Sequence, residues 1–280
     1  MAFTRPRWDE DVKTLGIPAA LLLLVALSAP AEANANLKPD YEVKLLLDPA
    51  DVLTSGHVPT TALTSYLDLG ASDTRSYQYL DTDPLDLDAE GWSVRERVVG
   101  SGDLQLDYKH RWTISDGDVD AALDQANDDG FDAADDNYDA EVDWGYGSEV
   151  LSAADDKTED EDLPSGQDAV DVAVADIPGK LDDWGTKNWG SQVLAESRVH
   201  GPVTTHQYEG TLDGHDVDLE VVPLRAASGS GTDYLVELSF KEQKESSAAS
   251  ARSAAISELD DQGWLLHQDS LKTSLILDRY

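Results

Sequence analysis

The sequence contains no cysteine and few basic residues. Without cysteine, neither a disulfide framework nor a thiolate metal site can form. Only 20 Lys and Arg stand against 57 Asp and Glu, so the formal net charge is −37 at pH 7. A negative field of this size repels nucleic acid and anionic membrane surfaces, which excludes both as general partners. Such an acidic surface is typical of solubility at high salt and says little about mechanism.

A long apolar run is missing everywhere except near the N-terminus. Three basic residues precede the apolar stretch 15–29, which is too short for a comfortable membrane span. Small residues at 31–35 have the spacing of a cleavage site. We therefore expect 1–35 to be a signal peptide and the mature protein, 36–280, to be secreted or extracytoplasmic. A retained N-terminal anchor is the alternative, because acidic residues weaken the basic region in front of the run.

Short strand-like segments joined by turns dominate the rest of the chain. At 280 residues with 40% hydrophobic residues, the chain can bury a core as one β-barrel. An Ala-rich helix is expected at 246–262, and the short connections favour antiparallel pairing. The expected strands are 41–47, 75–80, 92–99, 104–114, 138–151, 193–198, 204–212, 217–224, 234–240 and one or two within 265–280.

Charged residues recur at every second position of several of these strands. Successive side chains of a strand point to opposite faces, so Asp40, Glu42 and Lys44 share one face. If the sheet closes into a barrel, these charges line its interior, which suits a metal-bound polyanion. An exposed edge strand protected by charge is the alternative reading of the first segment. The same spacing returns in Arg95 and Arg97, Lys109 and Arg111, Asp218 and Glu220, and Glu237, Ser239 and Lys241.

Residues 113–179 are rich in Asp and Glu and hold a single basic residue, Lys157. We expect this segment to form an acidic outer layer of the same domain rather than a domain of its own. The stretch 124–136 has no register that places Asp, Gly and Glu together as a calcium loop requires, so a solvated acidic face is favoured.

Two motifs resemble those of the CYTH proteins, the triphosphate tunnel metalloenzymes, and the resemblance extends over about residues 40–280. The segment Asp40-Tyr41-Glu42-Val43-Lys44 resembles the family's Glu-x-Glu-x-Lys signature. The segment Tyr79-Leu80-Asp81-Thr82, followed by Gly91-Trp92-Ser93-Val94-Arg95-Glu96-Arg97, resembles the family's longer stretch Tyr-Phe-Asp-Thr … Gly-Trp-Ser-Leu-Arg-x-Arg. Lys109 and Arg111, Arg198, Glu237 and Lys272 follow in the expected order.

The resemblance implies a mainly β (α+β) fold, a closed eight-stranded antiparallel tunnel-like barrel with a few surface helices. It also implies that the tunnel binds a triphosphate or polyphosphate-like anion between basic side chains and Mg²⁺ or Mn²⁺. Arginine binds phosphate oxygens bidentately, and these cations prefer oxygen ligands. The expected phosphate-binding residues are Lys44, Arg95, Arg97, Lys109, Arg111, Arg198, Lys241 and Lys272. The expected metal ligands are Asp40, Glu42, Glu220 and Glu237, and Glu42 and Glu237 are also the expected catalytic residues.

Two positions depart from the family pattern. Ser239 stands where a second carboxylate is common, and Val221-Val222 stands where an Asp is common. Asp218 and Glu220 lie nearby, but a one-residue slip would turn them to the other face. Two function classes stay open: a metal-dependent phosphohydrolase, and a tunnel that binds phosphate-rich anions without hydrolysis. A nucleotidyl cyclase is a third possibility, which secretion disfavours because its substrate is scarce outside the cell.

Overall fold

The computed structural model of the chain describes residues 35–269 and 271–280. The expected signal peptide lies outside these residues, apart from Ala35. Across the part that is described, no helix is both long and apolar enough to cross a membrane.

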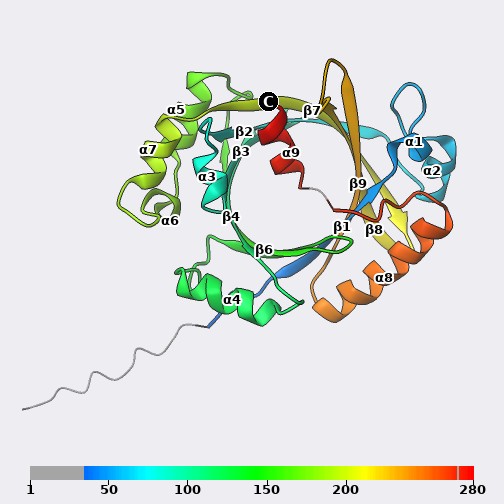
Figure 1. Ribbon diagram of the computed structural model, residues 1–280, viewed down its shortest axis with the longest axis horizontal. Helices are drawn as coiled ribbons and strands as arrows, with labels where there is room; N and C mark the ends of the chain where they lie inside the picture. The colour runs from blue at the N-terminus through cyan, green and yellow to red at the C-terminus, as the bar shows by residue number, and fades with distance from the viewer. Residues whose placement is uncertain (1–34, 270) are drawn as a thin grey trace, which may run out of the picture. The chain divides into compact units, whose positions relative to one another are not determined.

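The strands form one closed barrel, seen end-on in Figure 1. Around the barrel the strands follow the order β1-β5-β6-β4-β3-β2-β7-β8-β9, which returns to β1. A closed barrel leaves no strand edge unpaired. Within the described residues the strands are β1 (Asp40–Leu47), β2 (Ser72–Asp81), β3 (Trp92–Val99), β4 (Leu104–Thr113), β5 (Asp139–Trp144), β6 (Glu149–Glu159), β7 (Arg198–Leu212), β8 (His215–Arg225) and β9 (Thr232–Glu242).

The prediction of a mainly β closed barrel with a few helices is confirmed, but the number of strands is wrong. The described residues form nine strands rather than eight. The predicted strand 138–151 divides into β5 and β6, whereas most of the predicted strand 193–198 belongs to a helix, α7 (Trp189–Ala195), and to the turn after it. The pair of β1 and β5 is parallel, and the eight other neighbouring pairs are antiparallel. The acidic segment 113–179 therefore supplies two barrel strands in addition to surface helices.

Short helices cover the outside of the barrel. The Ala-rich helix predicted at 246–262 is present as α8 (Glu245–Asp261), with Ala248, Ala251, Ala255 and Leu259 as its buried stripe. The other outer helices of the described chain are α1 (Pro49–Val52), α2 (Thr61–Tyr66), α3 (Asp86–Ala89), α4 (Val119–Asp128), α5 (Gln167–Ala175), α6 (Gly179–Asp182) and α7 (Trp189–Ala195).

The last helix, α9 (Lys272–Arg279), lies inside the ring of strands rather than outside it (Figure 1). The sequence predicts one or two strands at 265–280, and that prediction is wrong for this segment. Ile276 and Leu277 of α9 pack in one apolar cluster with Val222, Leu224 and other inward-facing side chains. The helix therefore fills part of the barrel interior with apolar side chains and leaves the rest to polar ones.

The main core lies between the barrel and the outer helices. Val43, Leu45 and Leu47 of β1 belong to it, and they alternate with Glu42 and Lys44, which point inward. One face of each strand is thus apolar and packed, and the other lines the interior.

Candidate functional site

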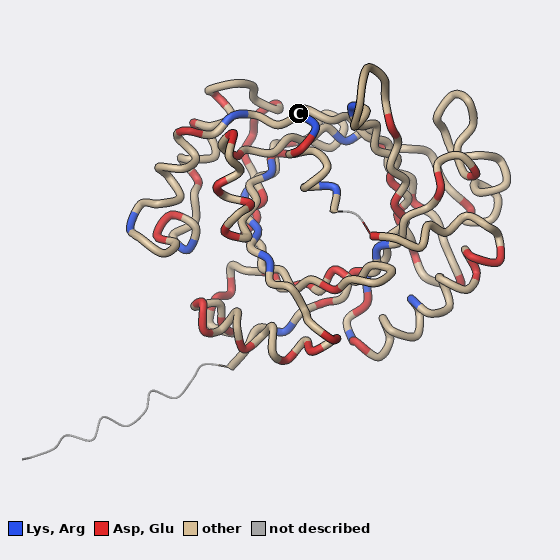
Figure 2. The backbone as a smooth tube through the Cα atoms, in the orientation of Figure 1, with Lys and Arg blue, Asp and Glu red and all other residues tan. Residues whose placement is uncertain are grey.

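A cavity of about 540 Å³ occupies the barrel interior, and its lining is mostly charged. Figure 2 shows Lys and Arg gathered along one side of the barrel. We call Arg75, Arg95, Arg97, Lys109 and Arg111, from the adjacent strands β2, β3 and β4, the basic wall. We call Glu42, Glu141, Asp143, Asp218, Glu220 and Glu237, from the strands β1, β5, β8 and β9, the acidic wall.

The basic wall carries more positive charge than its neighbours balance. Among its five members, as far as the described residues extend, only Arg95 has a carboxylate within ion-pair distance, Asp107 at 2.8 Å. Arg97 donates instead to the neutral amide oxygen of Gln105, at 2.9 and 2.6 Å. Arg111 donates to the Ser93 hydroxyl at 2.7 Å. Arg97 and Arg111 can therefore bind an anion without breaking an ion pair.

The lowered pKa of Arg97 reflects the same excess of positive charge. Burial, together with the positive charges of Arg95 and Arg75, lowers the pKa of the Arg97 guanidinium to about 10. An arginine whose pKa falls in this way is destabilised by its surroundings as long as no anion is bound. A polyanion in the cavity would remove the repulsion.

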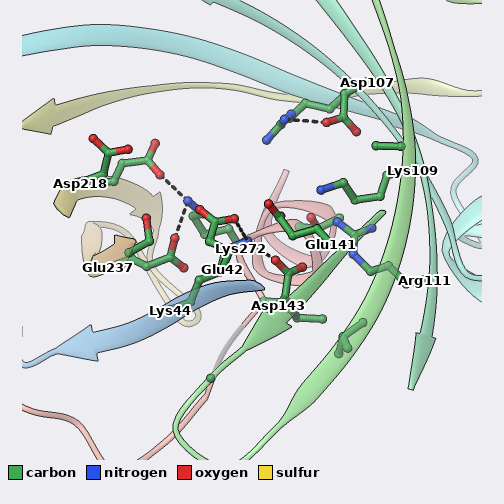
Figure 3. A pocket seen from close by; sticks show the side chains of 18 of the residues that line it. Glu42, Lys44, Asp107, Lys109, Arg111, Glu141, Asp143, Asp218, Glu237 and Lys272 are labelled. Atoms are coloured by element: carbon green, nitrogen blue, oxygen red, sulfur yellow. Dashed lines mark hydrogen bonds and ion pairs between the residues drawn. The ribbon is translucent and has the colours of Figure 1, made fainter. Parts of the chain in front are cut away.

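The acidic wall contains a group of three carboxylates that could hold a metal ion, which we call the metal cluster. Glu42 of β1 and Glu141 and Asp143 of β5 each offer an oxygen, and these oxygens lie within 4.8 Å of one another. The parallel pairing of β1 with β5 brings them together, because it sets Glu42 opposite Asp143. Figure 3 shows these side chains facing Lys109 and Arg111 across the cavity.

Two lysines balance negative charge of the metal cluster, and the raised pKa of one of its carboxyl groups reduces that charge further. Lys44 forms ion pairs with Glu42, at 2.9 Å, and with Asp143. Lys241 pairs with Glu141. Burial alone would raise the pKa of Glu42, but Lys44 and Lys241 outweigh it and hold that pKa at about 2. Burial and the charges of Glu42 and Asp143 raise the pKa of Glu141 to about 7. The donor set consists only of carboxylate oxygens, so it fits Mg²⁺ or Mn²⁺.

A second pair of carboxylates, Glu220 and Glu237, lies directly opposite one another on β8 and β9. Both are buried. Lys272, the first residue of α9, forms ion pairs with Glu220 and, at 2.8 Å, with Glu237. The Thr205 hydroxyl donates to Glu220 at 2.7 Å. Despite burial, these donors keep the pKa of Glu220 below its ordinary value.

Most of the residues expected from the sequence lie in the cavity. Asp40 and Arg198 do not line it. Asp40 is exposed at the start of β1. Arg198 begins β7, where its guanidinium donates to Asp83 at 2.6 Å and to the backbone oxygen of Tyr280 at 2.8 Å. The lining residues from that expectation are Glu42, Lys44, Arg95, Arg97, Lys109, Arg111, Glu220, Glu237, Lys241 and Lys272.

The charged lining residues outside the expected set are Arg75, Asp107, Asp139, Glu141, Asp143, Asp156, Asp218 and Asp269. Glu141 and Asp143 show the same every-second-residue spacing as the other strands, so this signal was present. The many carboxylates around them hid it. Asp218 also lines the cavity, so Val222 does not leave β8 without inward-facing carboxylates.

No model of a known protein family matches the chain, and no curated protein matches it. Among solved structures, the chain is similar to a proposed adenylyl cyclase from Hippeastrum that is described as having a dominant triphosphatase activity. The identity is 13%, the TM-score is 0.49, and 85% of this chain and 99% of that one are covered. A proposed adenylate cyclase from Bacillus halodurans has 14% identity and a TM-score of 0.49, and the match covers 85% of this chain and 96% of that one. A Pyrococcus horikoshii protein has 11% identity and a TM-score of 0.44, with 84% and 98% covered. Similarity this low carries no argument about activity.

Proposed function

We propose that the protein is a metal-dependent phosphohydrolase that acts on inorganic triphosphate or another triphosphate-containing anion inside the barrel. One observation carries the proposal: an undercompensated basic wall faces a cluster of three carboxylates across a single cavity. A phosphate chain between the walls would neutralise the first, and a divalent cation would neutralise the second. Hydrolysis of such a chain depends mainly on positioning and on charge stabilisation.

The residues of the two walls have different roles in this proposal. Arg95, Arg97, Lys109 and Arg111 bind and orient phosphate oxygens, and the arginines do so with paired N–H donors. The metal cluster would hold Mg²⁺ or Mn²⁺, which when bound neutralises phosphate charge and can activate water. Lys44 already lies beside the metal cluster, so it can contact a phosphate that bridges the two walls.

The test is phosphate release from triphosphate, short polyphosphate and ATP, with Mg²⁺, Mn²⁺ or a chelator. We expect metal-dependent release from the wild type. Glu42→Gln should lower kcat by about a hundredfold or more, because it removes one charge from the metal cluster. Asp40→Asn is the matched control, since Asp40 lies on the same strand outside the cavity lining. Equal loss in both variants would contradict the assignment of Glu42.

A second candidate function is anion binding without hydrolysis. Ser239 supports it, because this residue lies on β9 opposite Lys44 and Asp218 and offers a hydroxyl where a carboxylate could extend the metal cluster. This function predicts that triphosphate stabilises the protein while no phosphate is released with any metal.

We also propose that the protein is secreted, because its first 35 residues have the composition of a signal peptide. N-terminal sequencing of the protein from the culture medium tests this. A start within 32–36 supports cleavage, and recovery of the uncleaved chain with the cell membrane supports an anchor.

A further inference from the structure

Several buried polar atoms along the cavity have no hydrogen-bond partner. Each of them carries an N–H or an O–H group and can donate, so the group that they lack is an oxygen that accepts. A buried donor without an acceptor costs free energy, and it therefore calls for an explanation. Among the described residues that line the cavity, these atoms are Arg75 Nε, Tyr77 Oη, Arg95 Nε and Arg111 Nε.

Tyr77 differs from the three arginines because its hydroxyl is its only polar side-chain group, whereas a guanidinium has further nitrogens that can donate. Only 4% of Tyr77 is exposed. Its ring packs in the apolar cluster inside the barrel with Ile276 and Leu277, and it lies edge-on to Tyr79, with 6.3 Å between the ring centroids. These contacts hold the ring in place. Burial raises the pKa of Tyr77 well above its ordinary value, so the hydroxyl keeps its proton and can donate it.

The charged groups that act on the Tyr77 hydroxyl leave it without an acceptor. These groups are Glu220, Lys272 and Arg95, and all three line the cavity. Glu220 is the acceptor among them, but one of its oxygens accepts from Thr205 and the other pairs with Lys272. Lys272 and Arg95 are donors themselves. Their side chains are long and 24% exposed, so they can shift when an anion binds and admit one of its oxygens to the hydroxyl.

Tyr79 lies two residues further along β2 and provides a direct comparison. It lines the same cavity and is also 4% exposed. Its hydroxyl, however, accepts a hydrogen bond from the Thr273 hydroxyl of α9 at 3.2 Å. The protein itself therefore supplies a partner to Tyr79 and none to Tyr77 among the residues that the structure describes.

We propose that the Tyr77 hydroxyl donates a hydrogen bond to a phosphate oxygen of the triphosphate and so fixes the position of the anion beside Arg95 and Lys272. This inference rests on the proposed function for its ligand. A neutral donor adds no charge to the basic wall, so its contribution is directional. It favours an anion that presents an acceptor oxygen at this one place, whereas the arginines and lysines attract any anion.

Binding of inorganic triphosphate in the presence of EDTA tests the proposal without any need for activity. Calorimetric titration of the full chain in about 1 M KCl screens the acidic surface. Tyr77→Phe removes only the hydroxyl and should weaken binding at least about tenfold. Tyr79→Phe is the matched control and should leave the dissociation constant within about twofold. The proposal is overturned if Tyr77→Phe binds triphosphate as tightly as the wild type does, or if both variants weaken binding equally.

Melting temperatures without triphosphate separate a binding role from a structural one. Tyr77→Phe removes a buried donor that has no partner, so the melting temperature should stay the same or rise. Tyr79→Phe breaks the contact with Thr273 and should lower it. An equal fall in both variants would show that the protein itself satisfies the Tyr77 hydroxyl, and would contradict the proposal.

The two proposals of this article fail in different ways. If the wild type binds triphosphate but releases no phosphate with any metal, the hydrolase fails, and the loss of affinity in Tyr77→Phe still supports the role of Tyr77. If the wild type releases phosphate and Tyr77→Phe keeps full affinity, the role of Tyr77 fails alone. A wild type that binds no triphosphate overturns both.

Discussion

A buried carboxyl outside the cavity, Glu96, should limit the stability of the protein at neutral and alkaline pH. Glu96 lies on the outward face of β3 between the inward-facing Arg95 and Arg97, and it is fully buried. Gln78 donates to one of its oxygens at 2.6 Å. Its other oxygen has no partner among the described residues. Burial therefore raises the pKa of Glu96 from 4.5 to about 7.

The sign of the effect follows from which state binds the proton. Between pH 4.5 and about 7 the folded protein keeps Glu96 protonated while the unfolded chain loses that proton, so stability falls as pH rises. The shift in pKa corresponds to about 3 kcal/mol, all of which is lost above the folded-state pKa. Below pH 4.5 both states are protonated and the loss disappears.

Glu96→Gln removes the charge and keeps the shape and the contact with Gln78. Urea unfolding followed by tryptophan fluorescence should show the variant to be more stable than the wild type by about 3 kcal/mol near pH 8, and by little near pH 5. Glu161→Gln is the matched control, because Glu161 is exposed. A difference between Glu96→Gln and wild type that does not change with pH would refute the reasoning.

Two further predictions concern the cavity, and a third concerns the packing of α9. Triphosphate should raise the melting temperature of the wild type, and the double variant Arg95→Ala with Lys109→Ala should lose that shift; a shift of equal size would place the ligand elsewhere. Ser239→Glu adds a carboxylate opposite Lys44 and should raise the rate of phosphate release with Mn²⁺; an unchanged rate would mean that the missing carboxylate does not limit activity. Leu277→Ala should lower the free energy of unfolding by about 2–5 kcal/mol in urea titrations, because Leu277 is buried inside the barrel; a loss under about 1 kcal/mol would show that α9 contributes little there.

The inward-facing charges on long strands were the most predictable part of the site. Arg95, Arg97, Lys109 and Arg111 are basic residues in a chain that has few, and their spacing of two leaves one choice of face. Arg198 is also a basic residue of a strand, but it does not line the cavity, because it lies at the start of β7 beside the C-terminal residue. Periodicity gives the face of a residue but not its height along the barrel.

Two other features could not be predicted from local pattern. Glu141 and Asp143 have the spacing of two, but they lie among many other carboxylates, so the spacing alone does not single them out. The parallel pairing of β5 with β1, a long-range contact, does. The segment that forms α9 has apolar residues that suit a strand or a helix. Its conformation is decided by the apolar side chains that it meets inside the barrel, such as Val222 and Leu224.

The carboxylates of the metal cluster lie on both strands of the parallel pair β1 and β5, so an ion bound to them would also connect the two strands. This seam joins two strands that are remote in the chain, and its ladder is shorter than that between β1 and β9. Glu42 lies on one side of the seam, and Glu141 and Asp143 lie on the other. Any ion that these carboxylates share fastens the two sides together, as a removable cross-link does. Binding of an ion there would therefore stabilise the closed barrel at this seam, and removal of the ion would weaken the pairing of β1 with β5.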